Sequence, residues 1–239
     1  MNLALDVFED VGVTHIVLAG DTLDMYNVNA HGPKHPAIHT TLEDEINAGR
    51  EFVEYLVNRF PGVHIIWMAG NHFFRLERFI VDKVPSFYNL FRLEKMLRLE
   101  ELGVEFIPYN ERIQLGQAEL FVQHSPPSYS NNAAAASMVK KIDQSHIYGC
   151  SHRPDWSLKI GSSGRQYYTH MLGWFGDKGI FHRLQKEMPE NKKVFAFTKN
   201  HESWGRSFAL ASVHGKYHAT QHVLIDNYTC SIGPDIYKG

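Results

Sequence analysis

The sequence has little cysteine, little net charge and no long apolar run. Cys150 and Cys230 are the only cysteines among 239 residues, so a disulfide framework is excluded and a reducing compartment fits. The 24 lysines and arginines nearly balance the 26 aspartates and glutamates, so the formal net charge is only −2. Bulk charge therefore gives no attraction to nucleic acid, and such a partner would need a local site. No apolar run is long enough to span a membrane and no secretion signal is evident, so we expect a cytoplasmic protein without membrane contact.

Histidine, by contrast, is abundant. The chain has 15 histidines, and imidazole is both the commonest metal ligand and the side chain most easily tuned near neutral pH. Most histidines in proteins are nevertheless surface or core residues, so only the positions of these histidines can indicate whether any of them binds a metal. Hydrophobic residues at 44% and charged residues at 21% are ordinary globular values, and the length suits one domain spanning residues 1–239.

Short apolar runs and amphipathic stretches alternate along the first two thirds of the chain. Runs typical of buried parallel strands occupy residues 15–19, 63–68, 104–107 and 146–148. Helical patterns occupy residues 1–11, 73–83, 90–102 and 132–142, and a further helix begins at a capping box of Thr40 with Glu43. Residues 113–123 predict a hairpin, and β-like runs follow at 166–170, 194–198, 207–213 and 219–225. The pattern predicts an α/β fold whose β-rich tail, residues 156–239, packs as a second sheet against the first.

Polar side chains follow the predicted strands at the points where these strands end. They are Asp21 and Asp24, Asn71 and His72, His124, and His152. Ligands of open α/β sheets bind at the carboxyl ends of strands, and a mixed oxygen and nitrogen set suits Mn²⁺, Fe or Zn²⁺. Each residue alone also has a structural interpretation: Asp21 as a turn or cap residue, Asn71 as a left-handed turn residue, and His124 as a satisfied core histidine. Their joint occurrence favours a metal site.

The chain resembles the calcineurin-like metallophosphoesterases in four ordered blocks over residues 10–155. The blocks are Gly20-Asp21-Thr22-Leu23-Asp24, Gly70-Asn71-His72-Phe73-Phe74-Arg75, Gln123-His124 and Gly149-Cys150-Ser151-His152. They are similar to the Gly-Asp-x-x-Asp, Gly-Asn-His-Asp/Glu, lone His and Gly-His-x-His blocks of that family. The resemblance implies a four-layer α/β/β/α sandwich and two divalent metal ions, with Mn²⁺ foremost and Fe or Zn²⁺ as alternatives.

The resemblance also implies roles for individual residues. Asp21 would bridge both metals, Asn71 and His124 would bind the second, and His152 would bind the first. His72 would contact the phosphate as general acid or transition-state donor. Cys150 replaces the first histidine of Gly-His-x-His, so it is either a thiolate ligand or a small apolar substitute. Arg75 either holds phosphate oxygens or forms an ion pair on its own helix.

One block of the family is missing from this chain. The family begins with a strand carrying Asp-x-His, which supplies two ligands to the first metal, and nothing before Asp21 matches it. We expect either a truncated chain or a protein that has lost the first metal. Since the missing strand is central, its absence predicts an unpaired sheet edge and an exposed apolar face, hence poor solubility or pairing with another chain.

The expected function is metal-dependent hydrolysis of a phosphomonoester or phosphodiester by metal-activated water. The partner would be a phosphate-ester substrate, with nucleic acid left open; the alternative is a non-catalytic binding or assembly protein of the same fold. His31, His35 and His39 lie in a loop that is either solvated or a lid over the substrate. The remaining histidines of the tail are expected to be structural or on the surface: His170, His182, His201, His214, His218 and His222.

Overall fold

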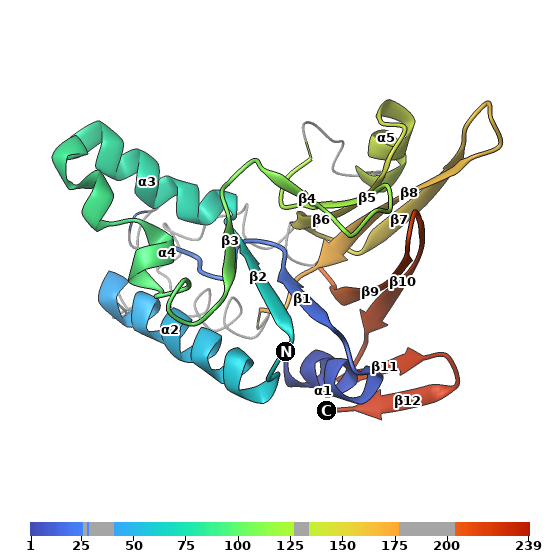
Figure 1. The fold of residues 1–239 in the computed structure, drawn as a ribbon, viewed down its shortest axis with the longest axis horizontal. Coiled ribbons are helices and arrows are strands. Elements are labelled where there is room, and N and C mark those ends of the chain that lie inside the picture. The colour runs from blue at the N-terminus through green and yellow to red at the C-terminus, as the bar shows by residue number, and fades with distance from the viewer. Residues whose placement is uncertain (26–27, 29–40, 127–133, 177–203) are drawn as a thin grey trace, which may run out of the picture.

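A computed structural model describes residues 1–25, 28, 41–126, 134–176 and 204–239. The loop with His31, His35 and His39 lies outside these residues, as do the strand expected at 194–198 and two tail histidines, His182 and His201. The described chain contains helices and several sheets, which confirms a mixed α/β class (Figure 1).

The first sheet has three parallel strands in the order β1-β2-β3. They are β1 (His15–Leu18), β2 (His64–Met68) and β3 (Glu105–Ile107). In β2, Ile65 and Trp67 enter one apolar core while Ile66 and Met68 enter another. Successive side chains of a strand point to opposite faces, so burial on both faces explains why this strand is a continuous apolar run.

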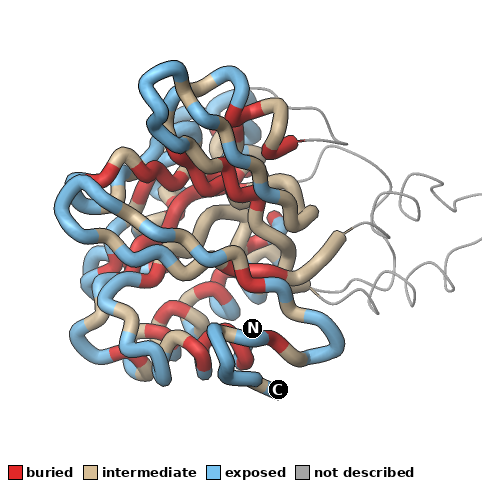
Figure 2. Tube along the Cα trace, turned by 90° about the vertical axis from the view of Figure 1, so that its right-hand side faces the viewer, coloured by how far each residue is buried: buried red, intermediate tan, exposed pale blue. Residues whose placement is uncertain are grey.

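Helices cover one face of this sheet. They are α1 (Asn2–Val11), α2 (Leu42–Arg59), α3 (Asn71–Lys83), the 3₁₀ helix η2 (Pro85–Leu90) and α4 (Leu93–Met96). Val53 and Leu56 of α2 and Phe73 of α3 pack with Trp67 of β2 in one buried core. The buried segments lie in the interior and the exposed ones run around the outside (Figure 2).

The second sheet has five strands and packs against the other face of the first. Its order is β4-β5-β6-β8-β7, and the strands are β4 (Arg112–Gln114), β5 (Leu120–Gln123), β6 (Ser145–His152), β7 (Asp155–Ile160) and β8 (Gln166–Gly173). Leu120 and Ile147 meet Ile66 and Met68 between the sheets. Helix α5 (Ala134–Lys141) lies on the outer face, where Met138 packs with strand residues such as Tyr148 and Met171.

Two antiparallel ribbons complete the described chain. One pairs β9 (Arg206–His214) with β10 (Tyr217–Ile225), and the other pairs β11 (Thr229–Ile232) with β12 (Asp235–Lys238). Leu3 and Val7 of α1 pack against Phe208 and Val223 of the first ribbon. The tail therefore returns to the N-terminal helix, and both chain ends lie at this corner (Figure 1).

Local details differ from the sequence expectations at several elements. The capping box of α2 uses Thr41 with Asp44, because the Thr-x-x-acid spacing occurs twice, one residue apart. One continuous helix is expected over residues 90–102, but only the last residue of η2 and the short helix α4 are helical there. The helix is interrupted because Arg92 has an extended backbone and Arg98 a left-handed one. Strand β6 runs on to His152, and β7, β11 and β12 were not expected. In the described part, β1 lies at an edge of its sheet.

Candidate functional site

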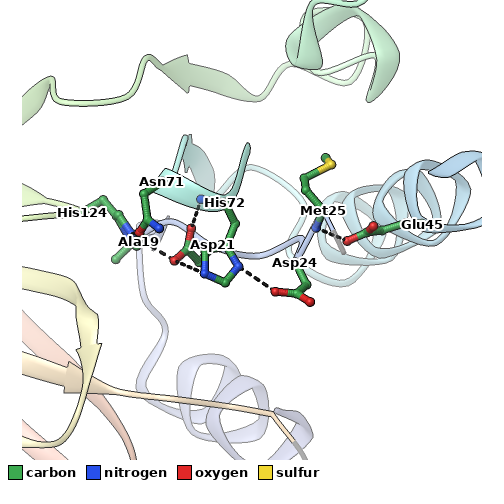
Figure 3. A network of polar contacts seen from close by, with 8 residues as sticks. All are labelled: Ala19, Asp21, Asp24, Met25, Glu45, Asn71, His72 and His124. Carbon is green, nitrogen blue, oxygen red and sulfur yellow. Dashed lines mark hydrogen bonds and ion pairs between the residues drawn. The ribbon is translucent and has the colours of Figure 1, made fainter. Parts of the chain in front are cut away.

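The ends of three strands bring Asp21, Asn71 and His124 together. Asp21 follows β1, Asn71 begins α3 directly after β2, and His124 follows β5. The Nε2 atom of His124 lies 3.0 Å from Oδ1 of Asn71 and 3.2 Å from Oδ2 of Asp21 (Figure 3). Residues fifty or more positions apart thus converge at one point, as the strand-end pattern predicts.

Two glycines make this approach possible. A Cβ atom on Gly70 would lie 2.0 Å from Oδ1 of Asp21 and 2.3 Å from its backbone nitrogen. A Cβ atom on Gly20 would lie 2.1 Å from Nδ1 of His124. These contacts are far inside van der Waals distance, so the glycine that opens each block is required by the packing of the acidic and imidazole side chains around it.

The two carboxylate oxygens of Asp21 have different roles: one makes a structural contact and the other faces the site. Its backbone is left-handed, with φ 49°, and its Oδ1 accepts a hydrogen bond of 2.9 Å from the backbone N–H of His72. That N–H belongs to the first turn of α3, where amide groups have no partner inside the helix. The cap interpretation of Asp21 therefore holds for one oxygen, while the other oxygen faces the imidazole of His124.

His124 is held in one orientation by a backbone carbonyl. It is 2% exposed, and its Nδ1 lies 2.7 Å from the carbonyl oxygen of Ala19. A carbonyl can only accept, so Nδ1 carries a proton and donates it. In the neutral ring, Nε2 then presents a lone pair toward the oxygens of Asn71 and Asp21. Lone pairs of three atoms, one each from His124, Asn71 and Asp21, therefore point to the same place. Their mutual repulsion is relieved either by a proton on Nε2 or by a bound cation.

The electrostatics of the cluster favour an ionised Asp21. Burial raises the pKa of this carboxyl group, but the hydrogen bond and charge of His124 act in the opposite direction. The charge of His72 and its backbone hydrogen bond lower the pKa further, so that the net shift is downward. An anionic oxygen at this point is what a cation ligand requires.

His72 is tied to a different carboxylate. Its Nδ1 lies 2.7 Å from Oδ1 of Asp24, whereas its Nε2 is 3.6 Å from Oδ2 of Asp21. The carboxylate of Asp24 accepts a hydrogen bond from Nδ1–H and turns Nε2 toward the cluster (Figure 3). Arg75 lies one turn after Asn71 on α3, and among the contacts of the described residues none joins it to Asp21, Asn71 or His124.

Two contacts around the cluster involve groups that the sequence pattern does not single out. Glu45 of α2 accepts a hydrogen bond of 2.6 Å from the backbone N–H of Met25, which anchors the chain just after Asp24. Glu45 is one of three acidic residues in the first turn of α2, and that placement is ordinary for a helix start. The carbonyl of Ala19 has no sequence signature at all. Only the folded backbone reveals either partner.

Cys150 and His152 extend from β6 rather than from a loop. The backbone N–H groups of Gly149 and Cys150 both donate to the carbonyl of His124, at 3.0 and 3.1 Å. The ring of His152 packs against two indoles, with centroids 4.3 Å from Trp204 and 6.5 Å from Trp174. The fourth block therefore supports the cluster through its backbone, while its histidine ring lies in an aromatic group.

The donor set is a carboxylate, an amide and an imidazole. Among the described residues, no three His, Cys, Asp or Glu side chains form a group that could hold a metal ion. Asp21 and His124 are two such residues, and the third donor beside them is the amide oxygen of Asn71. Cys150 and His152 do not complete a three-residue group with them. The chemistry of this set suits a single divalent cation with oxygen and nitrogen preference.

Comparisons with models of protein families, with curated proteins and with solved structures find no match for this chain. Within the described ranges, none of the helices has the length and apolarity needed to cross a bilayer.

Proposed function

We propose that the chain is a metal-dependent phosphoesterase with the four-layer α/β/β/α sandwich of the calcineurin-like metallophosphoesterases. The fold part of this proposal is supported by the order of the packed elements: helices α2 and α3, the β1–β3 sheet, the five-stranded sheet, and α5. The functional part is supported by one observation, the convergence of Asp21 Oδ2, Asn71 Oδ1 and His124 Nε2 at the strand ends.

These three atoms fit a divalent cation. His124 donates its other ring N–H to the carbonyl of Ala19, which is the usual outer partner of a ligating histidine. Asp21 supplies negative charge and Asn71 a neutral oxygen. When bound, a divalent cation supplies charge neutralisation to a phosphoryl group and acidifies water near neutral pH. Mn²⁺ is the first choice for this donor set, with Fe and Zn²⁺ as alternatives.

His72 is the group that handles the proton of the leaving group. In hydrolysis of a phosphate ester, the oxygen of water bonds to phosphorus, the bond to the leaving oxygen breaks, and that oxygen needs a proton. Asp24 accepts from Nδ1 of His72 and so keeps Nε2 directed toward the cluster. Nε2 is therefore the atom placed to hold a proton and donate it. Arg75, on the same face of α3 as Asn71, is the nearest candidate in sequence for a phosphate contact.

The decisive experiment measures Mn²⁺ binding and hydrolysis of bis-p-nitrophenyl phosphate by the purified chain and by Asp21→Asn. The asparagine keeps the shape of Asp21 and its cap on α3 but removes the charge. We expect Mn²⁺ affinity to fall by at least about 100-fold and hydrolysis to be lost. The matched control is His64→Gln, a half-exposed histidine on β2 that pairs with Glu105 instead. Equal Mn²⁺ affinity and hydrolysis in wild type and Asp21→Asn would refute the proposal.

A non-catalytic protein of the same fold is the second candidate. It is favoured by the aromatic packing of His152 and by the lack, in the described part, of a group of three His, Cys, Asp or Glu side chains. Elemental analysis separates the two functions. Bound metal, one ion or two per chain, together with hydrolysis supports the enzyme, while the absence of hydrolysis with metal supplied supports a binding or assembly role.

A further inference from the structure

A second group of histidines lies between β8 and the β9–β10 ribbon, with one ring buried and two partly buried. His170 of β8 is 4% exposed, and its ring centroid is 5.7 Å from that of His222 on β10. Tyr168 of β8 bridges the same layer, with ring centroids 6.4 Å from His170 and 6.3 Å from His218. Three imidazoles and a phenol therefore lie where β8 and the ribbon meet, beside the aliphatic contact of Leu172 with the cluster that holds Ala209 and Val213.

Most polar atoms of this layer have no partner. Neither ring nitrogen of His170 is hydrogen-bonded, and the same is true of Nδ1 of His218 and of His222 and of Oγ1 of Thr220. Two atoms do have partners: Nε2 of His222 lies 2.8 Å from Oγ of Ser207 on β9, and the hydroxyl of Tyr168 donates to Gln166. A buried imidazole without acceptors can be neutral at moderate cost, but its protonated form has nothing to stabilise it.

The charges around the layer mostly oppose protonation. Burial, together with the charges of the neighbouring His222 and His218, lowers the pKa of His170 to about 4. Burial and the charge of Arg165 lower the pKa of His218. Burial also lowers that of His222, against the opposing effect of Asp155. Asp155 is the one carboxylate that acts on the group, and it hydrogen-bonds the backbone of Ala135 instead.

The same junction is connected to the candidate site through the backbone. The N–H of Gly173, the last residue of β8, donates to Oγ of Ser207 at 2.7 Å. Next to it, the N–H of Trp174 donates to the carbonyl of Gly205 at 2.7 Å, and the N–H of Gly205 donates to the carbonyl of His152 at 3.1 Å. Separation of β9 from β8 would therefore break the contacts that hold the end of β6.

We propose that His170, His218 and His222 form an acid-sensitive contact between β8 and the β9–β10 ribbon, which opens when these imidazoles take up protons. Opening then releases the ribbon from β8 and from the backbone of His152. Opening of this acid-sensitive contact needs no ligand and does not depend on the phosphoesterase assignment. In this proposal the region around His152 is ordered at neutral pH and open in acid.

Amide hydrogen exchange tests this contact residue by residue. Protection factors, corrected for intrinsic exchange rates, are compared at pH 7.5 and pH 5.0 for β9–β10 and for α2, which lies on the other side of the first sheet. From an ordinary pKa of 6.5 and a folded pKa of about 4 for His170, we expect opening of the ribbon to rise roughly 30-fold. Protection in α2 should change by less than about threefold.

Two further measurements decide the role of His170 itself. In His170→Leu the acid-induced opening should fall at least about tenfold relative to wild type, whereas His64→Leu, at a half-exposed ring, should behave as wild type. Should His170→Leu fail to fold, NMR titration of the wild-type imidazoles gives the answer. Titration of His170 below pH 5 supports the contact; titration near 6.5, or ribbon protection that tracks α2, overturns it.

Discussion

His124 and His170 are almost equally buried, at 2% and 4% exposure, but their surroundings are opposite. His124 has a carbonyl on one ring nitrogen and two oxygens on the other. His170 has no partner on either nitrogen and two other imidazoles beside it. Burial alone therefore says little about what a histidine does; the atoms that face its nitrogens set its charge and its chemistry.

The two regions also differ in how they are built. The site around His124 is assembled from strand ends, with glycines that let side chains approach the backbone. The layer around His170 lies between the broad faces of two sheets, where side chains can shift without moving a strand end. Substitutions in the first region should therefore cost more stability, and those in the second should mainly change the response to pH.

The largest expected effect is that of Gly70→Ala. A Cβ atom there would meet the backbone nitrogen and carboxylate of Asp21, which cannot move without breaking the cap on α3. We expect a loss of more than about 3 kcal/mol in the free energy of unfolding, measured by urea denaturation. The matched variant beside the second region is Gly161→Ala, whose Cβ would meet the rim of the Tyr167 ring at 3.0 Å and the carbonyl oxygen of Arg165 at an ordinary 3.5 Å. For Gly161→Ala we expect a loss below about 1 kcal/mol in the free energy of unfolding. Similar losses for both variants would contradict the view that the first region tolerates substitution less well than the second.

Replacing each buried histidine by leucine compares the regions directly. His124→Leu removes the donor to Ala19 and leaves the carboxylate of Asp21 without its imidazole, so we expect a loss of about 2–3 kcal/mol at pH 7.5. His170→Leu replaces unpartnered nitrogens by apolar atoms, so the change should stay within about 1 kcal/mol and can be stabilising. Urea denaturation measures the free energy of unfolding of both variants. Equal losses would mean that His170 has partners which the static contacts do not show.

The sequence predicts the α/β class because its strands are apolar on both faces. Runs such as residues 15–18 and 64–68 must be covered on two sides, and the polar residues that follow them must meet at one sheet edge. That reasoning is enough to bring Asp21 and Asn71 together without knowledge of the connecting loops. His124 follows β5 of the five-stranded sheet, so its approach depends on how the two sheets pack. The resemblance to a phosphoesterase family and the metal itself stay predictions.

The sequence could not distinguish His170 from a surface histidine. Its strand alternates in the ordinary way, but what its ring meets depends on how β8 lies over β10, about fifty residues further along the chain. The position of His152 is equally non-local. The pairing of β6 with β8 is irregular between Tyr148 and His152, and the ring then lies beside Trp174 and Trp204. Periodicity assigns a face to a residue, but it does not assign the partner across that face.

Acid should destabilise the two regions in separate pH windows. The folded pKa of His170 is about 4 against an ordinary 6.5, so the unfolded chain takes up protons first and stability falls between these values. The pKa of Asp21 is lowered from 3.8, so its contribution is complete above 3.8 and is lost only at lower pH. From pH 7.5 to pH 5.0 we expect wild type and Asp21→Asn to lose about 2 kcal/mol each, and His170→Leu to lose much less. If His170→Leu lost as much stability as wild type between pH 7.5 and pH 5.0, the acid sensitivity would come from residues other than His170.

The smallest stability effect is expected where carboxylates are exposed. Asp24 is 60% exposed and contacts His72 at 2.7 Å, so Asp24→Asn should cost only about 0.5 kcal/mol in urea denaturation. Asp143, 70% exposed, pairs with Lys159 of β7 near the second region, and Asp143→Asn should cost the same. Hydrolysis separates the two: if Asp24 orients His72, kcat falls about tenfold with an altered pH profile in Asp24→Asn and stays at the wild-type value in Asp143→Asn. Because both pairs contribute equally little to folding, a difference in kcat between the two variants would come from the orientation of the His72 ring. Identical kcat values would remove Asp24 from the proposed chemistry while leaving the cluster of Asp21, Asn71 and His124 in place.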